Sequence, residues 1–169
     1  VKGVIEPKSD FRINKSKLEL IRNLQLLIID EVSMVRADLM DHIDVELRRI
    51  RRNSKPFGGV QLLMIGDLQQ LPPIAHGGED ELLRQYYKTL YFFSSAALKS
   101  MKYSCIELKT VYRQTDRHFI DILNRARECT LTYQDIADLN DRFIPGFSPK
   151  PEEGYIRLMT HNRQVDNIN

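Results

Sequence analysis

The sequence is poor in several features that identify particular classes of protein. It has no tryptophan and only two cysteines, Cys105 and Cys129, whose separation suits neither a metal site nor a disulfide framework. Its longest apolar candidate, Leu24 to Ile29, is far too short to span a membrane, and no signal segment follows Val1. We therefore expect a protein without a membrane span, in a reducing setting, which by default is the cytoplasm.

What is present is the composition of an ordinary globular protein. Hydrophobic residues make up 42% of the 169 positions and charged residues 28%, which suits one domain, or one domain and part of a second. The net charge is only +2, but cations cluster in one stretch at Arg48, Arg49, Arg51, Arg52 and Lys55. This cluster could face nucleic acid, or it could be the solvated last turn of a helix, where the helix dipole favours cations. We favour the helix end.

Hydrophobic patterning predicts an α/β fold with a parallel sheet. Residues 24–29 form an apolar run typical of a strand buried on both faces, and residues 60–65 predict a second strand. Between them, residues 37–52 carry an apolar stripe at helical spacing, which completes a βαβ unit with a right-handed crossover. Further helices are expected at 82–87, 95–101 (with Ser95 as N-cap), 118–127 and 132–139 (with a capping box of Thr132 and Asp135), further strands at 105–109 and 155–159, and a loop at 145–151.

Polar motifs follow both strands of the predicted βαβ unit. Asp30-Glu31 comes after the first strand, and Gly66-Asp67-Leu68-Gln69-Gln70-Leu71-Pro72-Pro73 comes after the second. The carboxyl ends of parallel strands are where ligands bind, and an NTPase needs carboxylates there for magnesium and for the attacking water. An amide such as Gln70 could sense the γ-phosphate. Each motif alone has a plainer explanation, an acidic helix start or a proline-closed turn, but two at adjacent strand ends favour a nucleotide site.

A third motif, Val111-Tyr112-Arg113-Gln114, follows the predicted strand at 105–109. A single arginine is usually a surface residue or an ion-pair partner. In this context Arg113 could instead supply the planar charge that stabilises a phosphoryl-transfer transition state.

Together these runs resemble the motifs of a known family. Asp30-Glu31-Val32-Ser33-Met34, the run from Gly66 to Pro73, and Tyr112-Arg113-Gln114 resemble motifs II, III and IV of superfamily 1 helicases. The run from Lys55 to Leu62, with the helix before it, resembles the signature of the petite-integration-frequency (Pif) helicases, a RecD-like group that moves 5′ to 3′ on single-stranded DNA. The resemblance covers about residues 24–127 and, more weakly, the chain from there to the C-terminus.

The resemblance implies RecA-like motor domains, with part of the first over residues 1–104 and the start of the second over 105–169. It implies ATP and Mg²⁺ as cofactors and assigns the following roles: Asp30 holds Mg²⁺ through water, Glu31 is the general base, Gln70 senses the γ-phosphate, Arg113 is the arginine finger, and Gly66 and Asp67 also line the nucleotide site.

Partners and setting also follow from the resemblance. The implied partners are single-stranded DNA and duplex or fork DNA, with no membrane, and the motor is expected to be a monomer. Thr160 and Asn162 could donate hydrogen bonds to DNA phosphates, although a polar strand end explains them equally well, and His76 could reach bases. The family implies work in DNA repair, recombination and telomere or genome maintenance. The compartment would be the bacterial cytoplasm at the nucleoid, or the nucleus or mitochondrion of a eukaryote.

The sequence lacks one part of the family pattern, because no Gly-x-x-x-x-Gly-Lys-Ser/Thr run occurs in it. We expect the P-loop before Val1 and the later motifs after Asn169, and we expect the chain alone neither to hydrolyse ATP nor to unwind DNA. Two alternatives stay open. One is an oligomeric ring ATPase, against which Pro-Phe-Gly-Gly and the paired prolines argue. The other is a nucleotide-independent DNA-binding or scaffold module derived from a helicase.

Overall fold

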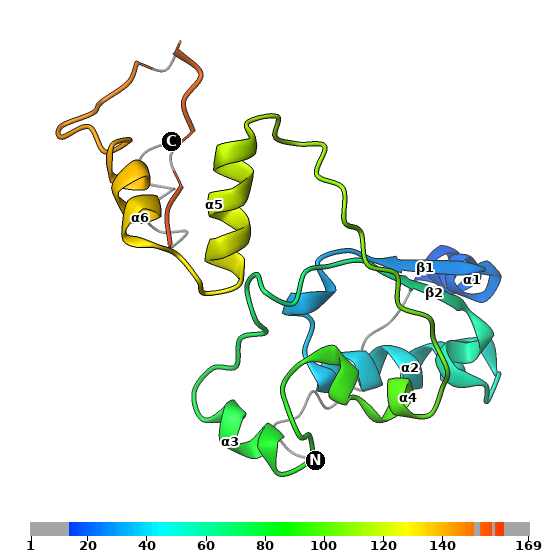
Figure 1. The fold of residues 1–169 in the computed structure, drawn as a ribbon. Helices are drawn as coiled ribbons and strands as arrows, with labels where there is room; N and C mark the ends of the chain where they lie inside the picture. Colours follow the sequence, from blue (N-terminus) through cyan, green and yellow to red (C-terminus); the bar gives the residue numbers. More distant parts are fainter. Residues whose placement is uncertain (1–13, 151–152, 157, 161–169) are drawn as a thin grey trace. The chain divides into compact units, whose positions relative to one another are not determined.

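The computed structural model describes residues 14–150, 153–156 and 158–160. The chain divides into two compact units, residues 1–109 and 110–169 (Figure 1). Within the described ranges, the strands and helices α1 to α4 belong to the first unit, and α5 and α6 belong to the second. No helix in these ranges is long and apolar enough to cross a membrane.

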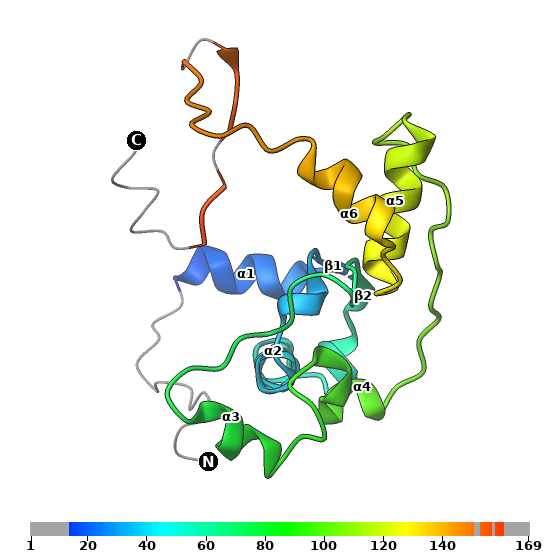
Figure 2. The ribbon, with the colours of Figure 1, turned by 60° about the vertical axis from the view of Figure 1, so that its left-hand side comes forward.

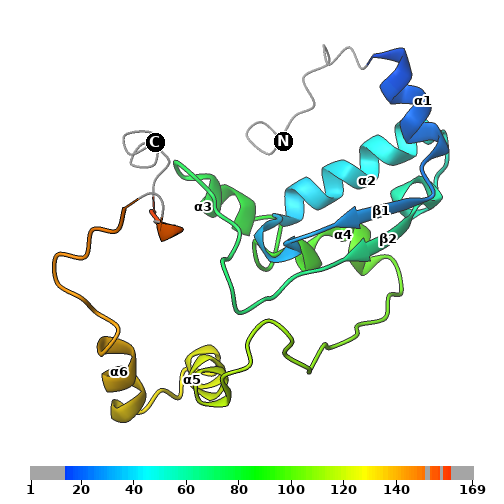
Figure 3. The ribbon, with the colours of Figure 1, turned by 90° about the horizontal axis from the view of Figure 1, so that it is seen from above.

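The first unit is organised around the predicted βαβ arrangement. β1 (Leu26–Ile29) and β2 (Gln61–Met64) are parallel neighbours, and Ile29 pairs with Met64 at the end of the register. α2 (Ala37–Arg51) connects the two strands and lies along them (Figure 3). The α/β fold and the parallel pairing predicted from the sequence are confirmed. Polar residues therefore follow two strands that end at the same edge of the sheet.

The two faces of this sheet differ in burial. One face packs on the core through Leu27, Ile29, Leu62 and Met64. The other face is exposed at Leu26, Ile28 and Leu63, and 54% of Ile28 is accessible. The prediction that the first strand is buried on both faces is wrong for this chain. In the described ranges, core packing against the strands is confined to one of their faces, and an apolar run cannot report which side a helix covers.

The core of the first unit lies under α2. Met40 and Phe57 are fully buried and belong to one apolar cluster, to which Leu47, Val60 and Leu98 also belong. The apolar stripe predicted for this helix is therefore the face that packs inward. The helix ends at Arg51, one residue before the end of the predicted helix, because Arg52 has a left-handed φ of 51°.

Shorter elements complete the first unit: α1 (Lys15–Asn23), η1 (Val32–Met34), η2 (Pro56–Gly59), α3 (Glu79–Arg84), η3 (Phe92–Ser94) and α4 (Ala96–Lys99). Ser95 caps α4 as predicted, because its side chain accepts a hydrogen bond from the amide of Leu98. The helix predicted at 82–87 begins earlier, at Glu79, since three acidic residues in its first turn suit the positive end of a helix.

The second unit contains two helices that lie side by side, α5 (Arg117–Arg127) and α6 (Tyr133–Asn140) (Figure 2). The predicted capping box is present at the start of α6, where Thr132 and Asp135 satisfy each other's backbone amides. The Arg125 guanidinium also binds Asp135, with 2.7 Å between Nε and Oδ2. The predicted loop has no regular structure over its described part, residues 145–150.

Two predicted strands are wrong. Residues 105–109 form no strand, and Ile106 and Leu108 are 84% and 88% exposed. The described residues of the predicted strand at 155–159 form none either, and residue 157 lies outside the description. A strand needs a neighbour to satisfy its backbone groups, and the sheet in the described ranges consists of β1 and β2. Alternation of apolar residues signals a strand only where such a neighbour exists.

Candidate active site

The acidic motif and the glycine-containing motif meet at one edge of the sheet. Backbone pairing continues past the ends of the strands: the Ile65 amide donates to the Ile29 carbonyl at 2.9 Å, and the Val32 amide donates to the Ile65 carbonyl at 2.9 Å. Asp30 and Glu31 lie between Ile29 and Val32, just after β1. Gly66 follows Ile65, just after β2. The structure therefore brings both motifs together, as their positions at adjacent strand ends predicted.

Gly66 makes the closest approach between the motifs. A Cβ atom at this position would lie 2.9 Å from the amide nitrogen of Val32 and 3.2 Å from that of Ser33. Such distances leave no room for a side chain, so glycine is required by the backbone that follows Glu31. The φ angle of Gly66 is not positive, and the requirement is therefore one of space and not of backbone conformation.

The acidic pair occupies an unusual backbone conformation. Glu31 has φ 49° and ψ 42°, in the left-handed region, at a cost of about 1 kcal/mol for a residue with a side chain. The Asp30 side chain supports this bend, because its Oδ1 accepts the Glu31 amide at 2.9 Å. Both side chains are exposed to solvent. An exposed carboxylate pair at a sheet edge, with backbone strain at Glu31, is typical of a functional site.

The second motif is organised by Asp67. Its carboxylate accepts the Gln69 amide at 3.0 Å and the Gln70 side-chain amide at 3.1 Å, and its carbonyl accepts the Gln70 backbone amide at 3.1 Å. Gln70 is exposed, and one end of its side chain is thereby held. The side-chain oxygen of Gln70 can still accept, and its amide can still donate a second hydrogen bond, which suits contact with both a phosphate oxygen and a water molecule.

The donor set at this edge suits a magnesium ion that is held mainly by other ligands. In the described ranges, no group of three or more His, Cys, Asp or Glu side chains could form a protein metal cage. Mg²⁺ keeps several waters and is usually bound by one or two carboxylates together with substrate phosphates. An exposed Asp30 with one carboxylate oxygen already engaged by the chain fits that mode of binding.

The basic cluster serves mainly the packing of the first unit. The Arg48 guanidinium binds Asp44 and the Ser54 carbonyl, and that of Arg51 donates to the carbonyls of Gly58 and Ile21, both at 2.9 Å. These side chains join α2 to the turn that follows it and to the end of α1. Internal contacts therefore occupy most of the cluster, in agreement with the preference for a helix end over a nucleic-acid surface.

Asp44 fixes the Pro-Phe-Gly-Gly turn from inside. Its carboxylate is buried and accepts the Phe57 amide, at a turn where Phe57 and Gly58 both have positive φ angles, of 52° and 62°. A Cβ at Gly58 would lie 2.7 Å from the Leu47 carbonyl. The sequence signature from Lys55 onward thus forms a turn that is fixed to α2 and leads into β2. Sequence reasoning recognised the signature but missed the buried carboxylate that holds it.

The remaining predicted residues lie elsewhere. Arg113 is exposed and belongs to the second unit, as does Thr160, which is also exposed. Asn162 lies outside the described residues. His76 is exposed in the loop after the prolines, and its backbone amide donates to Glu79 at 3.2 Å.

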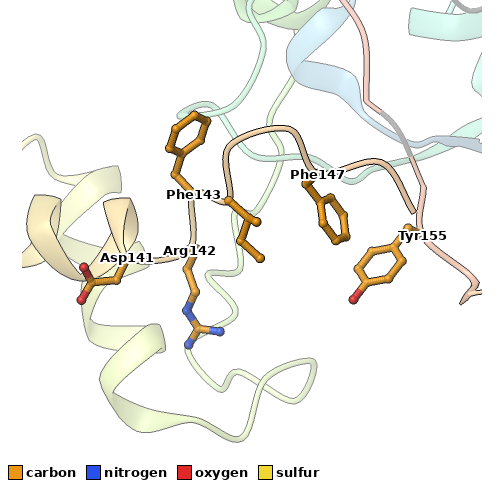
Figure 4. A pocket seen from close by; sticks show the side chains of 6 residues that line it. Asp141, Arg142, Phe143, Phe147 and Tyr155 are labelled. Carbon is orange, nitrogen blue, oxygen red and sulfur yellow. The ribbon is translucent and has the colours of Figure 1, made fainter. Parts of the chain in front are cut away.

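The second unit also has an open pocket of about 570 Å³ (Figure 4). Its lining residues are Asp141, Arg142, Phe143, Ile144, Phe147 and Tyr155. The rings of Phe147 and Tyr155 meet edge to face, with centroids 5.0 Å apart. None of the described residues that were predicted as site residues lines this pocket.

Comparison with known proteins identifies the family. The model of the PIF1-like helicase family matches residues 5–135, which is most of the chain. The chain belongs to the PIF1-like helicases. It is 42% identical over 123 residues to ATP-dependent DNA helicase RRM3 of Saccharomyces cerevisiae, covering 73% of this chain and 16% of that protein. It is 40% identical over 105 residues to ATP-dependent DNA helicase PIF1 of Homo sapiens, covering 62% of this chain and 15% of the relative.

Solved structures of PIF1-like helicases share the fold. Pif1 helicase from Bacteroides, in complex with ADP-AlF3 and single-stranded DNA, matches with a TM-score of 0.88 and 37% identity over 97% of this chain. Pif1 helicase from Candida albicans matches with a TM-score of 0.72 and 32% identity over 92% of this chain. This PIF1-like chain spans 39% of the Bacteroides chain and 33% of the Candida chain, and about a sixth of the first curated relatives. The predicted family and the RecA-like α/β fold are confirmed.

Proposed function

We propose that the chain is part of an ATP-dependent DNA helicase that couples ATP hydrolysis to 5′-to-3′ translocation on single-stranded DNA and to unwinding of duplex or fork DNA. The observation that carries the proposal is the contact of Gly66 with the backbone of Val32 and Ser33. It places the acidic pair and the glutamine loop side by side at one sheet edge, which is the arrangement that nucleotide hydrolysis needs.

The site residues divide the work of hydrolysis. Asp30 would hold Mg²⁺ through water, and the bound ion would neutralise charge on the phosphates. Glu31 would accept the proton of the attacking water as general base. Gln70, held through Asp67, would contact the γ-phosphate and the water, while Gly66 lets the loop approach. Arg113 would supply the positive charge of an arginine finger.

The two units would correspond to parts of two motor domains, the first over about residues 1–104 and the second from about residue 105. The two compact units, which divide after Lys109, support this proposal. Thr160, Asn162 and His76 would contact DNA. The longer protein would act as a monomer in DNA repair, recombination and telomere or genome maintenance, in the bacterial cytoplasm or in a eukaryotic nucleus or mitochondrion. The P-loop would come from chain outside this sequence.

Phosphate release from ATP tests this function in the full-length protein. With single-stranded DNA added, Glu31→Gln should lower turnover by about a hundredfold or more, since a general base contributes that much. Binding of a fluorescent ADP analogue should persist, because Glu31 acts on water and not on the nucleotide. Glu107→Gln, at an exposed position that belongs to none of the motifs, is the control.

The 169-residue chain by itself should release no phosphate above background. Turnover by this chain that Glu31→Gln removes would contradict the need for a P-loop from elsewhere. A full-length protein that binds DNA but neither binds nor hydrolyses ATP would show that the scaffold alternative is correct.

A further inference from the structure

A contact between Arg36, Asp38 and Glu79, none of which was predicted as a site residue, connects the segment after η1 to the loop that carries Gln70. Arg36, two residues after η1, binds the buried carboxylate of Asp38 through Nε at 2.9 Å and Nη2 at 2.7 Å. Its remaining amino group, Nη1, binds Glu79 Oε2 at 2.6 Å. The same Glu79 oxygen accepts the backbone amide of His76 at 3.2 Å. One carboxylate thus joins Arg36 to the turn at residues 76–78.

Arg36 is a rigid point of attachment. Its side chain is only 16% exposed, and the Asp38 side chain is fully buried beneath it. Its backbone is held as well, because Arg36 forms an antiparallel bridge with Tyr91 and the next amide donates to the Leu90 carbonyl at 2.8 Å. The two bonds to Asp38 already fix the guanidinium, so the third bond to Glu79 costs little further side-chain entropy.

The loop that Glu79 closes has few other attachments. Within the described residues 71–75, no hydrogen bond is made, and Pro73 is the buried residue of this stretch. Beyond it, Ile74 is 60% exposed and His76 is exposed, and Gly77 and Gly78 have open space around them. Backbone bonds hold the turn locally, since the Glu79 amide donates to the His76 carbonyl at 3.0 Å and the Leu82 amide to the Gly78 carbonyl at 3.4 Å. The Glu79 side chain is the contact that ties this turn to Arg36.

The charge on Glu79 is favoured by these contacts. The backbone amide of His76, and then the guanidinium of Arg36, hold the pKa of the Glu79 carboxyl below its ordinary value. Asp38, and then Glu79, hold the pKa of the Arg36 guanidinium above its ordinary value. Both Arg36 and Glu79 stay ionised, and their contact is a charge-assisted hydrogen bond.

We propose that Glu79 is a positioning residue that fixes the turn at residues 76–78 to Arg36, so that Ile74 and His76 are presented to single-stranded DNA. The inference rests on the proposed helicase function. An aliphatic side chain can pack against the face of a base, and an imidazole can stack on bases or donate to them, in a sequence-tolerant way that suits a motor moving along a strand. Because Arg36 lies two residues after η1, the tether also ties the DNA-facing turn to the segment that follows Asp30 and Glu31.

Binding of a fluorescein-labelled oligo-dT to the full-length protein tests the tether, together with the oligo-dT concentration that gives half-maximal ATP turnover. Glu79→Gln should raise the dissociation constant for oligo-dT, and the oligo-dT concentration that gives half-maximal turnover, by about tenfold each. This is within the range of coupling that such contacts carry. Saturating oligo-dT should restore the wild-type rate. Asp80→Asn is the matched control, because its ion pair with Arg84 is exposed on the same helix and holds no turn.

A double-mutant cycle with His76→Ala separates positioning from general stability. His76→Ala should weaken oligo-dT binding, and adding Glu79→Gln should weaken it little further, because both changes remove one presented contact. Three results would overturn the proposal. They are additive losses in the double variant, wild-type binding by His76→Ala, and a loss of binding in Asp80→Asn as large as that in Glu79→Gln. A wild-type protein without DNA-dependent ATP turnover would instead overturn the helicase function itself.

Discussion

Gly66, in the second motif of the candidate site, lies directly against the backbone of Val32, which follows the acidic pair of the first motif. The space beside the Gly66 Cα is filled by the amide and by the Cγ1 atom of Val32, and a Cβ at Gly66 would lie 3.0 Å from that Cγ1. Neither is the end of a flexible side chain, so neither can move aside without moving the acidic pair. The position of Glu31 is therefore set partly by a residue that carries no chemistry of its own.

Gly66→Ala should accordingly destabilise the first unit by about 1–3 kcal/mol, the usual cost of forcing atoms into a packed site. In the full-length protein it should also reduce ATP turnover, because the backbone after Glu31 must shift. Urea denaturation and phosphate release measure the two effects. Gly154→Ala is a comparison variant, since a Cβ there meets open space and only its φ of 73° opposes alanine. A fully active, fully stable Gly66→Ala protein would show that the contact is unimportant.

Two acidic residues of α2 should differ sharply in their contribution to stability. Asp44→Ala should cost about 2 kcal/mol, because it leaves the buried Phe57 amide without an acceptor and opens the Pro-Phe-Gly-Gly turn. Glu46→Ala should cost less than about 1 kcal/mol, since its partner Arg49 is 61% exposed. Chemical denaturation measures the free energy of unfolding of both variants. Equal losses would show that Asp44 does not hold the Pro-Phe-Gly-Gly turn.

Adjacent isoleucines on β1 should respond differently to the same substitution. Ile29→Thr places a hydroxyl against the core and should destabilise the 169-residue chain by about 2 kcal/mol, whereas Ile28→Thr, on the exposed face, should cost less than about 1 kcal/mol. Thermal unfolding measures both, and threonine preserves the β-branched side chain. If further chain covers the exposed face in the full-length protein, Ile28→Thr should become as costly there as Ile29→Thr.

Acid should weaken the pairing of α5 with α6. The Arg125 guanidinium, and then the Thr132 amide, hold the pKa of the Asp135 carboxyl far below its ordinary value. A lowered pKa means that this stabilisation is complete above the pKa of an unfolded aspartate, about 3.9, and is lost as the pH falls from there toward the folded-state pKa. Helicity of the second unit, followed from pH 6 to pH 2, should therefore decline at the acid end.

The neighbouring Asp138 acts in the same direction, because hydrogen bonds from Gln134 and then His118 lower its pKa. Asp135→Asn should remove part of the acid dependence and lower stability at neutral pH. Arg125→Gln should do the same, since it removes the largest cause of the shift. An unchanged acid profile in both variants would show that this contact does not govern the unit.

The sequence by itself determined the features that depend on residues close in the chain. The one-sided stripe of α2, the Ser95 cap and the capping box of Thr132 and Asp135 were all predictable, because their partners lie within a turn or two of helix. The motifs after β1 and β2 were predictable for a related reason, since parallel strands must end at the same edge.

Tertiary structure alone decided which apolar runs became strands and which contacts support the site. The alternation of residues 105–109 gives no strand here, because a strand requires a partner that no local pattern can guarantee. The bonds from Asp44 to Phe57 and from Arg36 to Glu79 join residues 13 and 43 positions apart. Sequence spacing does not reveal such pairs, since it is packing that brings their atoms within reach.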